Sequence, residues 1–327
     1  MSPFLQALIK TINFYGRFTP TFTRVGFVAR GLPFRPLRAD LTEQNWLITG
    51  ASGGLGRAAA LAAAGKGARV FAVGRNTLAL SQLVLDARAL SGTILPVVCD
   101  LSSMAAIAAV TRQAVFKGVA FDVLINNVGI LLRSYSRTPE GFETSYATNL
   151  LGHYMLTELL FAEGRLAKGA RIVNVVSGGF YNAPLNTDML NMPETSFNGF
   201  LAYASHKRAQ LALADHWRTA FAAAGVRAYA AHPGWADTDG VKSSLPKFRK
   251  VLAPILRNGA EGVDTIVWLA ATAPPEVSGE VWFDRKPRTA HVYPHTRTPK
   301  ATPQDIVDRL AQDRDAILNK EPVAVQA

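Results

Sequence analysis

Short apolar runs alternate with longer segments in which apolar positions recur at helical spacing, from about residue 45 to residue 290. The short runs have the length and flanks of buried strands, and each longer segment has one apolar face. Repeated strand, helix and strand units form a parallel sheet with helices on both faces. This pattern predicts one α/β domain with a single doubly wound sheet over residues 45–290. The expected strands are 46–48, 69–73, 94–98, 121–125, 171–176, 226–231 and 279–283, and the expected helices are 57–65, 77–90, 103–116, 143–167, 202–224 and 260–271.

The segments outside this alternation have other patterns. Residues 1–44 start with a short amphipathic helix at 5–12, continue with aromatic side chains among arginines, and end as a proline-containing linker. We expect them to form an arm outside the α/β domain. Residues 291–327 are expected to form a tail with one helix at 303–318.

The arm has an unusual charge. Residues 1–39 contain six basic side chains and no acidic one. An amphipathic helix followed by aromatics among positive charges is typical of a segment that lies on a membrane surface. Two alternatives stay open: the arm packs on the α/β domain or on a second subunit, or it is a mitochondrial transit peptide, against which its shortage of serine counts.

The remaining composition excludes several classes of protein. The net charge of the 327-residue chain is +11, but outside residues 1–39 it is only +5 and no nucleic-acid motif is present, so nucleic-acid binding is not expected. The single cysteine, Cys99, excludes an intramolecular disulfide, and no histidine or cysteine spacing suits a metal. No apolar run approaches the roughly 20 residues that cross a bilayer, and no signal peptide is found. We expect a cytoplasmic protein whose membrane contact, if any, is peripheral.

A glycine-rich turn connects the first expected strand to the first expected helix. In that order, glycines let the backbone approach a pyrophosphate, and the helix N-terminus offers free N–H groups. The sequence therefore predicts a dinucleotide site of the Rossmann type. Its expected cofactor contacts are Gly50, Ser52, Gly54, Leu55 and Gly56.

Tyr203 and Lys207 are four residues apart in an expected helix, which places both side chains on one face. An ammonium group beside a phenol favours the phenolate, so the pKa of Tyr203 would fall from its usual value of about 10 toward neutrality. A tyrosine of that kind can donate a proton to a carbonyl that accepts hydride, and can remove one in the reverse reaction.

These motifs, taken in order, resemble the short-chain dehydrogenase/reductase family over about residues 45–290, and finer features resemble its member 12 type. The resemblance implies a catalytic tetrad of Asn149, Ser177, Tyr203 and Lys207. In it, Ser177 would hold the carbonyl oxygen, Lys207 would bond the nicotinamide ribose, and Asn149 would hold a water in the proton path. The further cofactor contacts that the resemblance implies are Asp100, Leu101, Asn127, Pro233, Gly234 and Thr238.

Two departures from the family pattern are visible. Val128 stands where the family often has alanine, and the gap between Ser177 and Tyr203 resembles that of branches that act on lipophilic carbonyls. Residues 178–200, inside this gap, have no periodicity and indicate a loop. We expect this loop to cover the substrate cavity as a lid, with packing on the sheet edge as the alternative, because an exposed loop has no reason to contain so many apolar residues. These are Phe180, Tyr181, Leu185, Met189, Leu190, Met192 and Phe197.

The end of the second strand indicates the cofactor. An acidic residue there would accept a hydrogen bond from the ribose 2′-hydroxyl of NAD, but the chain has Gly74 and then Arg75. A guanidinium suits a 2′-phosphate, so the sequence favours NADP(H) over NAD.

The function predicted from these observations is an NADP(H)-dependent oxidoreductase that acts on a carbonyl or alcohol of an apolar small molecule. The alternative is a nucleotide-binding redox sensor or scaffold, against which the complete tetrad counts. An isomerase or epimerase lacks support, since no sugar-nucleotide domain follows the tetrad. The resemblance also implies a homo-oligomer through the helices at 143–167 and 202–224.

Overall fold

The computed structural model describes the backbone of residues 3–319, and the side chains of residues 13–319 apart from 239 and 243. Within this range eight strands form one sheet in the order β3-β2-β1-β4-β5-β6-β7-β8. Strands β1 to β7 are parallel to their neighbours, and β8 is antiparallel to β7. The strands are β1 Asn45–Thr49, β2 Arg69–Gly74, β3 Thr93–Val98, β4 Phe121–Asn126, β5 Leu166–Val175, β6 Arg227–Ala231, β7 Glu280–Phe283 and β8 Lys286–Thr289.

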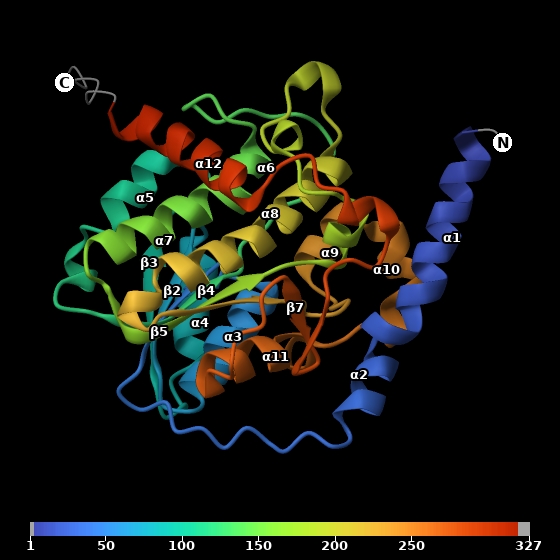
Figure 1. Ribbon diagram of the computed structural model, residues 1–327. Coiled ribbons are helices and arrows are strands. Elements are labelled where there is room, and N and C mark those ends of the chain that lie inside the picture. The colour runs from blue at the N-terminus through green and yellow to red at the C-terminus, as the bar shows by residue number, and fades with distance from the viewer. Residues whose placement is uncertain (1–2, 320–327) are drawn as a thin grey trace.

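Helices cover both faces of the sheet, so the expected doubly wound α/β fold is confirmed (Figure 1). Helices α3, α4 and α11 pack on one face, and α5, α7, α8 and α12 pack on the other. The helices are α1 Pro3–Phe22, α2 Arg24–Gly31, α3 Gly54–Ala64, α4 Thr77–Asp86, α5 Met104–Val110, α6 Thr144–Tyr146, α7 Gly152–Ala162, α8 Gly199–Ala220, α9 Asp239–Ser244, α10 Pro246–Leu252, α11 Gly259–Thr272 and α12 Pro303–Leu318.

Local capping explains where three of these helices start. The Asn198 side chain accepts a hydrogen bond from the Leu201 amide at 3.0 Å, at the start of α8. Capping boxes start α11, at Asn258, and α12, at Thr302. Such caps satisfy first-turn amides that have no partner inside the helix.

Three segments differ from their expected structure. The helix expected over 143–167 is interrupted by a π-helix at Ala147–Leu151 and ends at Ala162, before β5. Strand β8 was not expected. Residues 237–258, for which no helix was expected, contain the short helices α9 and α10.

The N-terminal segment packs on the α/β domain. Phe18 and Phe22 are buried in a cluster with Phe180, Tyr181 and Phe283. The Trp235 amide also donates a hydrogen bond to the Phe22 carbonyl at 2.8 Å. The packing alternative therefore holds for this part of the arm. The apolar positions of residues 4–12 lie outside the described side chains, and none of the described helices is long and apolar enough to cross a bilayer.

Much of the apolar surface of residues 178–200 is buried in the core. Phe180 and Tyr181 pack under α1, and Leu185 and Leu190 join the cluster on the α8 side of the sheet. Three short 3₁₀ helices, Gly178–Asn182, Thr187–Met189 and Glu194–Ser196, hold the segment in place. The lid hypothesis is wrong for these side chains, because their apolar surface is used to close the interior and not a cavity.

The C-terminal helix α12 also belongs to the core. Ile306, Val307 and Leu310 are buried, and the Tyr146 hydroxyl donates a hydrogen bond to the Asp313 carboxylate at 2.7 Å. Helix α12 packs on α8, one of the two helices expected to form a subunit contact. Part of the α8 face is thus covered by a helix of the same chain.

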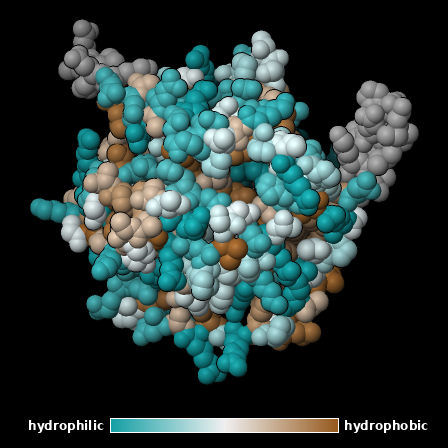
Figure 2. Space-filling model, in the orientation of Figure 1, coloured by the Kyte–Doolittle hydropathy of each residue, from teal (hydrophilic) through white to brown (hydrophobic). Residues whose placement is uncertain are grey.

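The surface of the molecule that is visible in Figure 2 is mostly hydrophilic, with apolar residues in small patches.

A buried ion pair joins the N-terminal segment to the end of the sheet. Arg257 and Asp284, at 1% and 0% side-chain exposure, are 2.7 Å apart between Nη1 and Oδ1. Arg257 Nε also donates to the Phe22 carbonyl at 3.0 Å, and Arg30 Nε donates to the Asp284 carboxylate at 2.7 Å. One carboxylate thus neutralises two guanidinium groups that come from distant parts of the chain.

We predict that Asp284→Ala lowers the free energy of unfolding by about 3–5 kcal/mol, because it leaves buried positive charge without its partner. Urea denaturation followed by circular dichroism measures this loss. Arg24→Ala is the matched control: its pair with Glu261 is 2.8 Å long but the arginine side chain is 58% exposed. Its cost should stay within about 1 kcal/mol. Equal losses in the two variants would contradict the prediction.

Candidate active site

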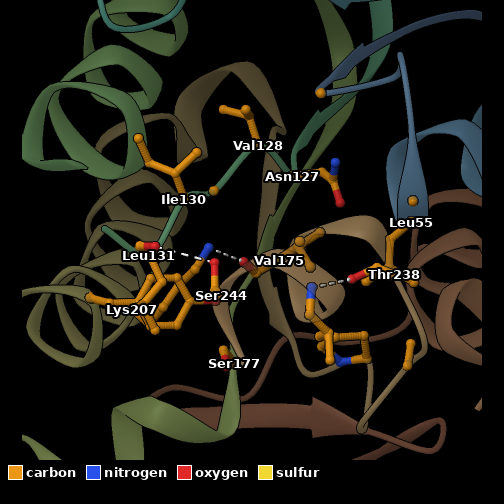
Figure 3. Close-up of a pocket in the computed structure, with 18 of the residues that line it drawn as sticks. Leu55, Asn127, Val128, Ile130, Leu131, Val175, Ser177, Lys207, Thr238 and Ser244 are labelled. Carbon is orange, nitrogen blue, oxygen red and sulfur yellow. Dashed lines mark hydrogen bonds between the residues drawn. The ribbon is translucent and has the colours of Figure 1, made fainter. Parts of the chain in front are cut away.

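A cavity of about 820 Å³ opens at the carboxyl ends of the central strands. It is lined by the glycine turn after β1, the segments that follow β4, β5 and β6, and residues of α8. Figure 3 shows Leu55, Asn127, Ser177, Lys207 and Thr238 around it. Ligands of open α/β sheets bind at this edge.

The glycine turn has the geometry of an anion site. Gly50 has a φ of 67°, and a Cβ at Gly56 would lie 2.3 Å from the Gly50 carbonyl oxygen, so both positions require glycine. Asn127 ties the turn to β4, because its side-chain amide donates to the Thr49 carbonyl at 2.8 Å. Helix α3 starts without a side-chain cap, so its first amides point toward the cavity mouth without an internal partner.

The expected adenosine end lies beside β2 and β3. Arg75 Nη1 is 3.7 Å from Asp100 Oδ2, and the Arg75 side chain is 67% exposed. Asp100 Oδ1 also accepts hydrogen bonds from the Ser102 amide and hydroxyl, which fixes the turn before Leu101. Gly74 allows the end of β2 to lie close to Ser52, because a Cβ at this position would be only 3.1 Å from Ser52 Oγ.

Ser177 and Tyr203 meet at the cavity. Ser177 is the second residue after β5, and its hydroxyl lines the same cavity as Tyr203 on α8. Burial raises the pKa of Tyr203, and the polar hydroxyl of Ser177 lowers it by less. The net direction is opposite to the expected fall, so in this structure the phenol keeps its proton at neutral pH.

Lys207 lies one turn further along α8 and is buried. Its Nζ donates to the Val175 carbonyl at 2.8 Å and to Gln210 Oε1 at 3.0 Å, and lies 5.7 Å from the centre of the Tyr203 ring. Burial lowers the pKa of Lys207 to about 7. The Lys207 ammonium is directed at these two oxygens, and burial disfavours its positive charge. Lys207 therefore does not offset the rise that burial causes in the pKa of Tyr203.

Asn149 is in the π-helix, and both ends of its side-chain amide bond the Ile130 backbone at 2.8 Å. Its carbonyl oxygen accepts a hydrogen bond from Gln210 Nε2 at 2.6 Å. The Asn149 side chain is thus bonded to the Ile130 backbone, and its backbone oxygen is bonded to Gln210, a residue that was not singled out from the sequence.

The turn after β6 faces the glycine turn. Gly234 has a φ of 75°, and its amide donates to His232 Nδ1 at 2.8 Å. Pro233 precedes it, and Thr238 caps α9 by accepting from the Val241 amide at 3.3 Å (Figure 3). A Cβ at Gly54 would lie 3.4 Å from Thr238 Cβ, so the two turns approach closely across the cavity.

The predicted catalytic and cofactor residues line this cavity, except for Gly56 and Asn149, and several other residues of the cavity were missed. Phe14 and Tyr15 of α1 line it, as do Trp235 and Phe248. The aromatic rings of Trp235 and Phe248 are 5.0 Å apart between centroids, and those of Tyr15 and Phe248 are 6.0 Å apart. The aromatic run of the arm was the available signal, but no pattern indicated which surface it would cover.

A family model described as short chain dehydrogenase matches residues 44–248. The chain belongs to the short-chain dehydrogenase/reductase family. Dehydrogenase/reductase SDR family member 12 of Bos taurus is 32% identical over 325 residues, which cover 93% of this chain and 98% of the relative. Retinol dehydrogenase 12 of Homo sapiens is 31% identical over 247 residues, 73% of this chain and 77% of that protein. The expected likeness to the member 12 type is confirmed.

Solved structures of this short-chain dehydrogenase/reductase fold hold nicotinamide dinucleotides. A blue fluorescent protein from a metagenomic library, in complex with NADPH, has a TM-score of 0.60 and 22% identity over 75% of this chain and 97% of its own. A 3-ketoacyl-(acyl-carrier-protein) reductase from Brucella melitensis, complexed with NADH, has a TM-score of 0.58 and 23% identity over 74% and 97%. These likenesses show the fold.

The cavity of this oxidoreductase family member fits a nicotinamide dinucleotide. The unpaired amides at the start of α3 suit its pyrophosphate. Gly129 leaves Lys207 reachable from the cavity, because a Cβ at that position would lie 3.3 Å from Nζ. Gly50, Gly54, Asn127 and Thr238 would form the walls between these two points.

Proposed function

We propose that the chain is an NADP(H)-dependent oxidoreductase that reduces the carbonyl group of an apolar small molecule or oxidises the corresponding alcohol. One observation carries this proposal. Ser177 and Tyr203 line the same cavity as the glycine turn, with Lys207 Nζ 5.7 Å from the centre of the Tyr203 ring. That arrangement puts a proton donor beside the place where a dinucleotide would present its nicotinamide.

The roles of the side chains follow from their surroundings. The bound dinucleotide supplies or accepts the hydride. Ser177 hydrogen-bonds the substrate oxygen, and Tyr203 donates its phenolic proton as negative charge develops there. Because burial raises the pKa of Tyr203, the phenol is in the protonated state that reduction requires. Lys207, whose pKa is lowered to about 7, is charged below that pH and then stabilises the phenolate that remains.

The choice of NADP(H) rests on Arg75. Its exposed guanidinium stands at the end of β2, where Gly74 offers no acceptor to a ribose hydroxyl. Asp100 is 3.7 Å away, far enough that a 2′-phosphate can compete for the same guanidinium. Charge-assisted bonds from arginine to phosphate are stronger than those between neutral groups.

The choice of an apolar substrate rests on the outer wall of the cavity. Aromatic and aliphatic side chains dominate this wall, with no acidic side chain described among its lining residues except Asp100 at the adenosine end. Relatives named retinol dehydrogenase and polyprenol dehydrogenase act, by their names, on long apolar alcohols. The wall residues that support an apolar substrate for this chain as well are Phe14, Tyr15, Leu132, Phe200, Trp235 and Phe248.

We also propose that the exposed face of the N-terminal segment contacts an anionic membrane surface, where such substrates are found. Val25, Val28 and Leu32 of this segment are 62%, 51% and 82% exposed. Arg24 and Arg30 are paired with acids of the domain, whereas Arg17, Arg35 and Arg38 are exposed. Each basic side chain near an anionic surface contributes about 1 kcal/mol, which suits reversible binding.

Tyr203→Phe should lower the turnover of an apolar aldehyde with NADPH by about 10²- to 10⁴-fold, because it removes the proton donor and keeps the ring. The affinity for NADPH, measured by calorimetry, should stay within about twofold. Tyr135→Phe, which removes a hydroxyl outside the cavity, serves as the control. Turnover of Tyr203→Phe at the wild-type rate would refute the mechanism.

Arg75→Ala should weaken NADPH binding by about tenfold or more, since one charge-assisted bond to the phosphate is worth about 1.5–3 kcal/mol before screening by solvent. NADH binding should change little. Arg88→Ala removes a similarly exposed arginine from the end of α4 and controls for net charge. Equal weakening of the two cofactors by Arg75→Ala would contradict the NADP(H) assignment.

Sedimentation with vesicles of phosphatidylcholine and phosphatidylserine tests the membrane proposal. The wild-type protein should pellet at low salt and be released at high salt, because exposed charges are screened. Leu32→Asp should pellet less, whereas Leu78→Asp should pellet as wild type, since Leu78 is 84% exposed but lies on α4. A wild-type protein that stays in the supernatant at low salt would rule the proposal out.

A further inference from the structure

The buried side chain of Gln210 connects the ammonium of Lys207 to the π-helix and to α7. Gln210 Oε1 accepts from Lys207 Nζ at 3.0 Å, and Nε2 donates to the Asn149 carbonyl at 2.6 Å. Nε2 is also 2.9 Å from His153 Nδ1. The carbonyl of Asn149 can only accept, so the amide nitrogen must face it. The amide oxygen is therefore committed to Lys207.

The same reasoning assigns the tautomer of His153. Because Gln210 donates to Nδ1, the ring hydrogen is on Nε2, which lies 3.3 Å from Thr49 Oγ1. Thr49 accepts from the Asn127 amide at 2.9 Å, and its hydroxyl donates to the Ile125 carbonyl at 3.2 Å. Burial lowers the pKa of His153 to about 3, so the ring is neutral.

These bonds form a chain with one polarity, from Lys207 through Gln210, His153 and Thr49 to the carbonyl of β4. Every donor in it points away from the lysine, and its last member only accepts. An amide does not relay protons as a water does. This series of hydrogen bonds therefore gives Lys207 an acceptor, but it cannot transfer the lysine proton away from the site. Its last donor is Thr49, the residue that precedes the glycine turn.

We propose that Gln210 is a positioning residue that holds Lys207 charged and in place for the reaction. The inference rests on the proposed function. Two of the three N–H groups of the ammonium are used by Val175 and Gln210, and the third is left for the cavity, where Gly129 gives access. Val175 contributes a backbone oxygen, so Gln210 is the contact that a side-chain change can test.

Few titratable groups face Lys207. Tyr203 and His206 do so from α8, and His153 does so from α7. Burial lowers the pKa of His206 to about 4, so both histidines are neutral near pH 7. A change in the ionisation of Lys207 on substitution of Gln210 would therefore report the lost or gained contact, and not the titration of a neighbour.

The test uses the full chain labelled with ¹³C at lysine Cε, with the Lys207 signal assigned from the Lys207→Met variant. The ionisation midpoint of Lys207 is followed by NMR, without substrate, in the wild-type protein and in three variants. Gln210→Met removes the acceptor and should lower the midpoint by about one pH unit, a tenfold change. Gln210→Glu places a carboxylate beside Nζ and should raise it. Thr157→Val, which removes a buried hydroxyl that bonds Asn126 and the His153 backbone, should leave the midpoint unchanged.

Opposite shifts in the two Gln210 variants would support the proposal, because a merely structural role predicts no difference in sign. An unchanged or lowered midpoint in Gln210→Glu would overturn it, and this holds even when Gln210→Met does not fold. The titration needs neither substrate nor turnover, so a failure of the proposed function leaves its result readable. In an active enzyme, the rate of carbonyl reduction should change with pH around the ionisation midpoint of Lys207. That change should shift in each variant in the same direction as the midpoint.

Discussion

The site depends on keeping one positive charge inside the protein at the carboxyl edge of the sheet. Transfer of an ammonium from water to the interior is costly, and burial accordingly lowers the pKa of Lys207 to about 7. The charge is tolerated because the end of β5 and the Gln210 amide present oxygens at 2.8 and 3.0 Å. Those oxygens are in reach only when β5 and α8 have this relative register. The packing of α8 on β5 and β6 is thus part of the chemistry as well as of the fold.

The two sides of the cavity have different origins. The side around the glycine turn is built from residues within 44–248, the range that the family model matches. The outer wall receives Phe14 and Tyr15 from α1, which precedes this range. Arg257 and Asp284, which follow it, hold the N-terminal segment and the Pro233 carbonyl together. The part of the cavity around the glycine turn is therefore combined with an outer wall to which α1 contributes.

This combination has a physical consequence for the N-terminal segment. The carbonyl of Phe22 accepts from both Trp235 and Arg257, so the end of α1 is bonded to the turn that faces the glycine turn. Movement of α1 would disturb the cavity wall and that turn together. The segment thus has two faces with separate roles, an inner face that completes the core and an outer face with Val25, Val28 and Leu32 exposed.

The sequence by itself determined the features that depend on local physics. The order of strands and helices follows from apolar periodicity, and the glycine turn follows from backbone conformations and approaches that only Gly50 and Gly56 permit. The positions of Ser177, Tyr203 and Lys207 follow from one strand end and one helix face. Helix 303–318 was located correctly because Thr302, Pro303 and Asp305 are local capping signals.

Only the tertiary structure decided what these elements contact. An apolar pattern indicates that a segment buries one face, but it does not indicate the surface on which that face packs. That surface is formed by residues distant in the sequence, as is the case for α12, the N-terminal arm and residues 178–200. The predicted fall in the pKa of Tyr203 was wrong for the same reason. Sequence spacing identifies the neighbour, Lys207, whereas the desolvation that raises the pKa depends on the folded interior. Gln210 was missed because a polar residue one turn beyond Lys207 gains its meaning only from Asn149 and His153, which reach it from another helix.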